Sequence, residues 1–336
     1  MTQEPLPMIF ITGYSRSGTT MMARIISRNK PVHAFHEMHF FEQLWMPSAV
    51  KKNITKDEGA LLVAKMMAIH REGYLNNHHP ENFIDDARKM LKDYNDEYFP
   101  PLLFKHFLFA ECRHHLKSIP CDQTTRNTLF LTEILSYYPT AKVICMVRDP
   151  RDVLLSQKRK WKRKFLGGSS IPFRETVRAY INYHPITISK LWNAAATRIA
   201  KVNHPQVMKI KFEELLQQPE AIIRQICEFT GLTYDDNMLR VPHVGSSNTQ
   251  DTGEKQGISA DKTGKFTDGL NNTEIYLAQK VTKQNRDHFG YDDVEVKPNP
   301  FKLVYYYCIL PVKLGLALIL SLSRTQNLWA TIKRRL

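Results

Sequence analysis

The residues best spaced for chemistry form a turn near the N-terminus. Residues 8–20 read MIFITGYSRSGTT, an apolar run followed by a tight turn and a helix start. Such a turn directs backbone N–H groups at an anion. Gly13 and Gly18 have Walker A spacing, but Thr19 stands where that motif has lysine, and Arg16 supplies a charge inside the loop. These residues favour a nucleotide that ends in one 5′-phosphoryl group over a triphosphate. The alternative is a strand, a turn and a helix without a ligand.

A second candidate anion site follows the apolar run at 142–147. Arg148 comes directly after this predicted strand, and Ser156 lies two turns along the helix that follows. In open α/β sheets, ligands bind at the carboxyl ends of the strands. A guanidinium and a hydroxyl together suit a second, separate phosphate. Arg148 could instead pair with Asp149 or Asp152 at the surface.

Four segments in order resemble the sulfotransferases that use 3′-phosphoadenosine 5′-phosphosulfate (PAPS). They are GYSRSGTT, VRDPRDVLLSQ, the stretch at 207–232, and GKF at 264–266 with HFGY at 288–291. The resemblance implies an α/β, three-layer P-loop-like fold with a central, mostly parallel sheet flanked by helices. It implies that the 5′-phosphosulfate is held by Arg16, Ser17, Gly18, Thr19 and Thr20. It likewise implies that Arg148 and Ser156 hold the 3′-phosphate, with Lys265 closing over it and Phe266 beside that loop.

The candidate general base is Glu37. It lies in EMHFFE, which resembles a stretch of the glycan sulfotransferases, and its spacing from the loop matches the glutamate of the tyrosylprotein sulfotransferases. In both groups this glutamate is the base, so the resemblance implies that role for Glu37. A partly desolvated carboxylate has a raised proton affinity. The alternative is a glutamate favoured by a helix dipole. Arg16 is expected to share in catalysis, and His39 to orient Glu37 or the acceptor.

The histidines do not predict a metal site. His33, His36 and His39 recur every third residue, whereas zinc ligands on one helical face usually recur every fourth, and no nearby cysteine or acid completes a set. The pairs at 78–79 and 114–115 are interpreted as surface residues. We therefore expect no metal.

One position departs from the family pattern. Many relatives carry a lysine that contacts the transferring sulfonate, and the corresponding stretch here is CDQTTRN at 121–127, with Gln123 in that place. Glutamine can donate a hydrogen bond but cannot offset developing charge. Either Arg16 supplies this charge alone, or Arg126 or Lys105 reaches the site, or the enzyme is slow. The acidic and hydroxyl residues of this stretch could also simply cap a following helix.

Composition bounds the architecture. A chain of 336 residues with 43% hydrophobic content can bury one large core. Predicted strands at 8–12, near Val32, at 142–147 and at 207–211 alternate with helices, which favours a parallel sheet covered on both faces. The predicted organisation is a catalytic domain at 1–296, with a helical insertion at 55–118 and a lid loop at 244–273, and a C-terminal tail at 297–336.

The chain is basic, with a net charge of +14, which suits a multiply charged anionic donor. The run KRKWKRK at 158–164 could meet an anionic glycan, lipid headgroups or nucleic acid, or could be solvated. No nucleic-acid module accompanies it, so no such partner is predicted. Residues 303–322 are nearly uncharged, and basic residues follow them. They favour a helix at an anionic membrane interface over a full span, and the alternatives are docking on the domain or a dimer seam.

These patterns together predict a PAPS-dependent sulfotransferase that releases adenosine 3′,5′-bisphosphate. The favoured acceptor is a hydroxyl of a glycan, lipid or lipid-linked carbohydrate. Alternatives are protein-tyrosine sulfation, a P-loop nucleotide kinase or hydrolase, and a non-catalytic membrane-associated scaffold. Five cysteines without a C-x-x-C pair, and an N-terminus without a basic-then-apolar leader, predict a cytoplasmic enzyme, peripheral at the cytoplasmic face of a membrane.

Overall fold

The fold is built on one parallel β-sheet. The computed structural model describes residues 7–47, 52–74, 79–165, 171–242, 257–258 and 263–321. Its five strands lie in the order β2-β3-β1-β4-β5. They are β1 (Ile9–Gly13), β2 (Val32–Phe35), β3 (Ile119–Asp122), β4 (Lys142–Val147) and β5 (Val207–Lys211). Every pairing is parallel, so all five carboxyl ends meet at one edge.

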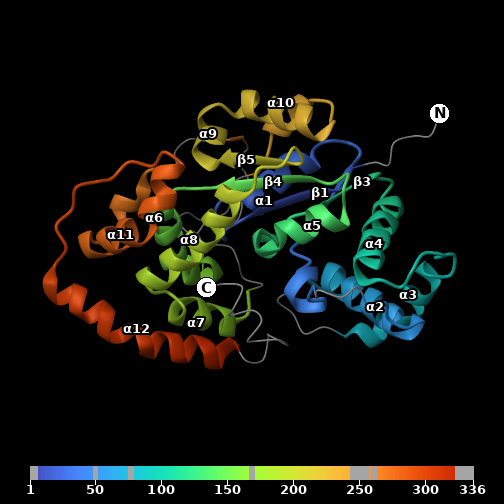
Figure 1. Ribbon diagram of the computed structural model, residues 1–336, viewed down its shortest axis with the longest axis horizontal. Coiled ribbons are helices and arrows are strands. Elements are labelled where there is room, and N and C mark those ends of the chain that lie inside the picture. The colour runs from blue at the N-terminus through green and yellow to red at the C-terminus, as the bar shows by residue number, and fades with distance from the viewer. Residues whose placement is uncertain are drawn as a thin grey trace.

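The sheet has helices on both faces because its central strands are apolar on both sides. Along β1, Phe10 joins one buried cluster, whereas Ile9 and Ile11 join the cluster on the opposite face. This alternation follows from the two-residue period of a strand. The predicted three-layer α/β fold with a parallel central sheet is therefore confirmed (Figure 1).

The helices divide between these two faces. The first face is covered by α2 (Lys56–Glu72), α4 (Pro100–His114), α5 (Leu131–Tyr137) and α8 (Pro185–Lys201). The opposite face is covered by α1 (Thr19–Ser27), α9 (Phe212–Gln217) and α10 (Pro219–Thr230). Further helices are α3 (Ile84–Met90), α6 (Pro150–Lys158), α7 (Phe173–Ile181) and α11 (Asn272–His288). The stretch predicted as a helical insertion forms α2, α3 and α4, which gather at one side of the molecule (Figure 1).

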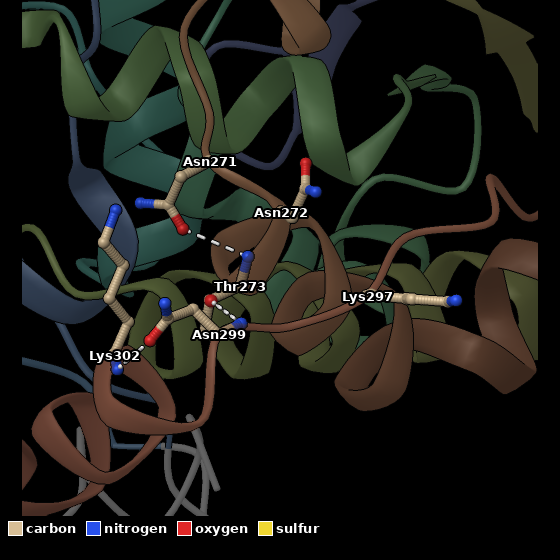
Figure 2. A pocket seen from close by; sticks show the side chains of 6 residues that line it. All are labelled: Asn271, Asn272, Thr273, Lys297, Asn299 and Lys302. Atoms are coloured by element: carbon tan, nitrogen blue, oxygen red, sulfur yellow. Dashed lines mark hydrogen bonds between the residues drawn. The ribbon is translucent and has the colours of Figure 1, made fainter.

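The final described helix, α12 (Pro300–Ser321), is anchored at its start. Asn271 caps α11 by accepting from the backbone N–H of Thr273, whose hydroxyl in turn accepts from the N–H of Asn299 (Figure 2). Asn299 then accepts from the N–H of Lys302. These contacts surround an open pocket of about 450 Å³, which shares no residue with the predicted nucleotide site.

Most of α12 is exposed. It lies beside α7 along the edge of the molecule, and large apolar side chains such as Phe301, Leu316 and Ile319 face solvent (Figure 1). Its segment Pro300–Leu320 is long and apolar enough to cross a membrane. Lys313 turns back to α7, where its ammonium donates to the Tyr180 carbonyl.

Candidate active site

The loop between β1 and α1 has the form of an anion cradle. Gly13 and Gly18 both have positive φ angles, 153° and 92°. A Cβ at Gly13 would overlap the Met146 carbonyl, and one at Gly18 would overlap the Phe212 ring, so only glycine fits at either position. Gly18 is also the N-cap of α1 and provides no capping side chain. The first-turn N–H groups of α1 therefore lack a side-chain cap, as an anion-binding helix start requires.

Ser17 and Arg16 supply side chains in this loop. The Ser17 hydroxyl is fully buried and has no hydrogen-bond partner in the described part of the chain. A buried, unsatisfied hydroxyl carries a free-energy cost that an anionic ligand would remove. Arg16 has a φ of 76°, and its Nε donates to Oγ of Ser156 at 2.9 Å. The 5′ and 3′ phosphate sites predicted from distant segments are therefore adjacent.

Arg148 joins the same group. Its Nη1 donates to the Arg16 carbonyl at 3.2 Å, and its guanidinium lies over the Phe212 ring with 4.7 Å from Cζ to the centroid. The alternative, that Arg148 pairs with Asp149 or Asp152 at the surface, is not favoured, because both acids have other partners. Asp149 instead pairs with Arg151, and Asp152 accepts from the N–H of Gly264.

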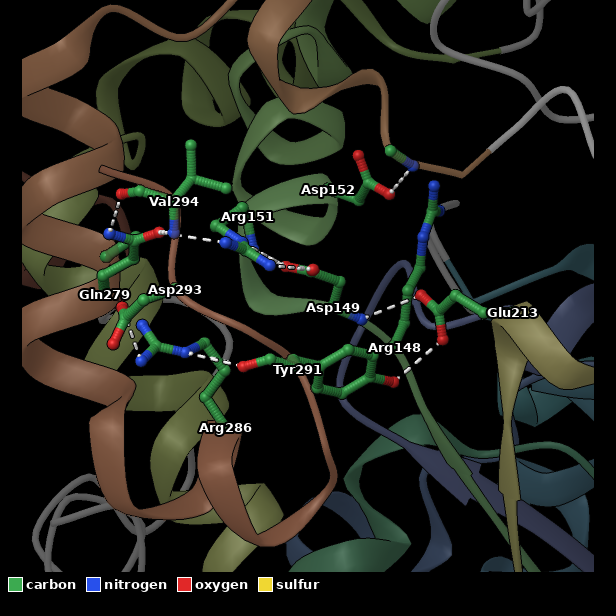
Figure 3. Close-up of polar contacts among 12 residues, drawn as sticks. Arg148, Asp149, Arg151, Asp152, Glu213, Gln279, Arg286, Tyr291, Asp293 and Val294 are labelled. Atoms are coloured by element: carbon green, nitrogen blue, oxygen red, sulfur yellow. Dashed lines mark hydrogen bonds and ion pairs between the residues drawn. The ribbon is translucent and has the colours of Figure 1, made fainter. Parts of the chain in front are cut away.

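A buried polar network fixes the segment that carries Arg148 (Figure 3). Asp149 receives two hydrogen bonds from the Arg151 guanidinium, at 3.0 and 2.7 Å. The N–H of Asp149 donates to Glu213, which also accepts from the Tyr291 hydroxyl at 2.8 Å. Glu213 begins α9 after β5, and Tyr291 follows α11. The network therefore joins the ends of β4 and β5 to the chain after α11.

Glu37 lies beyond the end of β2 with its side chain 37% exposed. Its Oε1 accepts from the Thr125 hydroxyl at 2.9 Å, and its Oε2 lies 3.3 Å from Nε2 of the buried His39. Burial raises the pKa of Glu37. The contacts with His39 and Thr125 and the charge of Lys160 outweigh burial and hold the pKa at about 2. The prediction that partial desolvation gives Glu37 a raised proton affinity is therefore wrong.

The backbone around Glu37 is held from β3. The Thr124 hydroxyl accepts from the N–H groups of Met38 and His39 and donates to Asp122. Asp122 is buried, and burial raises its pKa to about 7. His39 has a left-handed φ of 48°, and its ring lies 3.9 Å from that of Tyr74. The 121–127 stretch therefore positions Glu37, rather than only capping a helix.

Lys160 is the functional candidate that sequence reasoning missed. It begins a 3₁₀ helix, Lys160–Phe165, directly after α6. Burial and then the charge of Arg16 lower its pKa from 10.5 to about 8, whereas Glu37 acts in the opposite direction. Lys160 therefore lies in the electrostatic field of both the loop arginine and the candidate base. Two other lysines of this basic run have different surroundings, since Lys158 pairs with Glu274 and Lys162 is exposed.

The other candidates for the missing lysine differ from Lys160 in partner or exposure, although Arg126 also interacts electrostatically with Glu37. Gln123 is buried, and none of the described residues forms a hydrogen bond with its Oε1. Arg126 pairs with Glu42 at 2.7 Å, and Lys105 is exposed on α4. Lys160 is thus better placed than Arg126 or Lys105 to supply the second cation.

The remaining predicted site residues lie in the first turn of α1 and in the segment around Lys265. Thr19 is buried and Thr20 exposed in the first turn of α1. Lys265 is exposed, and Phe266 is buried with its ring 4.4 Å from Cζ of Arg151. Most of the predicted lid loop, 244–256 and 259–262, lies outside the described residues, as does His78.

Comparisons with known proteins agree with this architecture. The sulfotransferase family profile matches residues 7–236. A putative protein-tyrosine sulfotransferase of Caenorhabditis briggsae is 25% identical over 235 residues, which cover 69% of this chain and 68% of that protein. Protein-tyrosine sulfotransferase A of Caenorhabditis elegans is 24% identical over 238 residues, which cover 69% of this chain and 52% of that protein.

A solved structure supports the fold. The sulfotransferase domain of the olefin synthase of Synechococcus PCC 7002 superposes with a TM-score of 0.51 at 18% identity, covering 86% of this chain and 96% of that domain. The family profile extends from the start of the sheet through α10 and spans more than half of the chain. The protein therefore belongs to the sulfotransferase family.

Proposed function

We propose that this protein transfers a sulfonate group from PAPS to an acceptor hydroxyl, with Glu37 as the general base. The observation that carries this proposal is the convergence of Arg16, Lys160 and Glu37 at one edge of the sheet. Two cations and a carboxylate thus lie within electrostatic range of one another beside this loop. This arrangement suits transfer of an anionic group to a hydroxyl.

The chemical step is an in-line displacement. The acceptor oxygen forms a bond to sulfur, and the bond between sulfur and the bridging phosphate oxygen breaks. Glu37 takes the hydroxyl proton, and adenosine 3′,5′-bisphosphate leaves. Because the donor is multiply anionic, its binding beside Arg16 and Lys160 offsets their charges and raises the pKa of Glu37 toward that of a useful base.

The loop fits such a donor. The buried Ser17 hydroxyl and the uncapped start of α1 can both donate to a 5′-phosphosulfate. Arg148 and Ser156 would bind the 3′-phosphate, with Ser156 exchanging its bond from Arg16 for one to the ligand. Lys265 lies on the segment that the hydrogen bond from Gly264 to Asp152 attaches to α6.

In this proposal Lys160 performs the role of the family lysine whose position Gln123 occupies. Its ammonium can stabilise charge that develops on the bridging oxygen, which a glutamine amide cannot. Arg16 then shares this charge with Lys160 instead of carrying it alone.

Two acceptor classes remain in competition. Protein tyrosine is one candidate acceptor, because the two nematode relatives are named protein-tyrosine sulfotransferases. The exposed apolar face of α12 favours a lipid or a lipid-linked carbohydrate at an anionic membrane surface. The second class also accounts for exposed Phe173 and Tyr180 on α7, which extend the same apolar face.

The test is transfer of labelled sulfate from PAPS into a host-cell extract by wild type and by Glu37→Gln. Products are separated into lipid, glycan, protein and small-molecule fractions. Label that appears in one fraction and is lost with Glu37→Gln supports the reaction and names the acceptor class. If Glu37→Gln transfers as well as wild type, Glu37 is not the base. Magnesium-dependent ATP turnover would favour the kinase alternative, and PAPS binding without transfer would favour the scaffold.

A further inference from the structure

Three histidines from distant parts of the chain meet outside the proposed transfer site. His33 lies on β2, His70 on the last turn of α2, and His115 directly after α4. One ring nitrogen from each lies within 4.8 Å of those from the other two. The rings of His33 and His115 stack with centroids 4.4 Å apart, and the His70 ring stands edge-on to both. The chain thus brings three imidazoles to one point.

The hydrogen bonding of this cluster is incomplete. Nε2 of His33 and Nδ1 of His70 are buried and have no hydrogen-bond partner among the residues that the structure describes. A buried polar nitrogen without a partner is costly and uncommon in native structures. Aromatic rings around the cluster offer no conventional partner, since Phe35 contacts His33 and Phe107 contacts His70. A ligand that accepts nitrogen lone pairs would satisfy the orphaned atoms.

We infer that His33, His70 and His115 form a binding site for a divalent transition metal, with Zn²⁺ the best match. Three imidazoles with a fourth position open to water are an established zinc ligand set. Around a tetrahedral Zn²⁺ the ligand nitrogens lie about 3.4 Å apart, so the three rings draw together on binding. His115 is exposed at the end of α4, which provides both the freedom for this movement and an entry path.

The surroundings fit a bound cation. The buried Glu111 carboxylate lies 3.9 Å from Nε2 of His70, so its negative charge faces the protonated Nε2 of the tautomer in which Nδ1 binds the metal. Nearby positive groups already have acceptors: Arg71 faces Glu111 and Asp86, and Lys117 donates to the Lys30 carbonyl. A metal here would fasten α2 and α4 to β2, the strand that leads to Glu37.

The test uses the full-length protein without a histidine tag. Zn²⁺ is titrated in competition with a chromophoric chelator, Co²⁺ binding is followed by its visible absorption, and the melting temperature is measured with and without Zn²⁺. Wild type is expected to bind one equivalent and to melt at a higher temperature with Zn²⁺. His115→Gln should bind at least 100-fold more weakly and lose the thermal shift. Glu111→Gln should bind about 10–100-fold more weakly, as loss of a carboxylate behind a ligating histidine does.

His114→Gln is the matched control, because His114 is also exposed and precedes His115 in the chain. It should bind Zn²⁺ as wild type does. The inference is overturned if wild type binds no metal, if His115→Gln keeps wild-type affinity, or if His114→Gln weakens binding equally. His115 is exposed, so its replacement does not disturb the core and the comparison does not depend on whether a His70 variant folds.

Discussion

Nε of Arg16 donates a hydrogen bond to Oγ of Ser156 at 2.9 Å, although 140 residues separate them in the chain. Arg16 belongs to the loop after β1, and Ser156 to the helix after β4. Because β1 and β4 are parallel neighbours, their carboxyl ends bring these two segments together. The bond therefore joins the two predicted phosphate sites.

Ser156→Ala should weaken PAPS binding by about 1.5–3 kcal/mol, roughly 10- to 150-fold, because one hydrogen bond to the charged 3′-phosphate is lost. Isothermal titration with PAPS and with adenosine 5′-phosphosulfate checks this assignment. Only the donor with a 3′-phosphate should lose affinity. An equal loss for both donors would place Ser156 at the 5′ end instead.

Lys160→Met should lower kcat by about 10²–10³-fold and change PAPS affinity less, because its charge stabilises the transition state. Steady-state kinetics provide the measurement, with an acceptor from the fraction that the labelled-sulfate experiment identifies. Lys162→Met is the control, since Lys162 lies in the same basic run but is exposed, and its kcat should be unchanged. Equal losses in the two variants would indicate a general effect of surface charge.

The lowered pKa of Lys160 predicts an alkaline limb in the pH profile. In the free enzyme Lys160 loses its proton near pH 8, so kcat/KM for PAPS should fall above that pH. Lys160→Arg should move the limb upward, because a guanidinium stays charged. A limb near pH 8 that persists in Lys160→Arg would assign the titration to another group.

The same shift predicts the direction of a stability change. Between about pH 8 and 10.5 the unfolded chain binds more protons at Lys160 than the folded protein does. The free energy of unfolding attributable to Lys160 therefore rises with pH across this window. Denaturant unfolding of wild type and Lys160→Met measures it. The difference between the two curves should rise with pH across this window.

The exposed face of α12 should bind anionic vesicles. Phe301→Glu and Ile319→Glu, at side chains 85% and 65% exposed, should each reduce co-sedimentation about tenfold or more, because each removes an apolar contact worth about 1.5–3 kcal/mol and adds a repelled charge. Leu116→Glu is the control, since Leu116 is 94% exposed after α4 and outside α12. No binding by wild type would contradict the membrane proposal.

Much of the fold follows from local sequence. The predicted strands at 142–147 and 207–211 have the bounds that the structure gives them. The first is a short, buried apolar run, as is typical of interior parallel strands, whereas the second is an edge strand that contains two lysines. The interior strand β3 was missed. It has only four residues and contains Pro120, paired opposite His33, and proline normally argues against an interior strand.

The site was predictable only where a motif marks it. Arg16, Ser156 and Arg148 stand in motifs, and the structure brings them together. Lys160 stands in a run of similar cations, and the sequence does not indicate which of these side chains lies near Arg16 and Glu37. The sequence also does not predict the cluster of His33, His70 and His115, because their proximity depends on how α2 and α4 pack against β2.

The ring of Phe212 lies against Gly18 on one side and under the Arg148 guanidinium on another. Phe212 is therefore a rigid spacer between the loop predicted to hold the 5′ group and the cation predicted to hold the 3′ group. A nucleotide that reaches both must carry its two anionic ends at the separation this ring imposes. Discrimination between donors would then depend partly on a hydrocarbon side chain, through its thickness rather than through any charge.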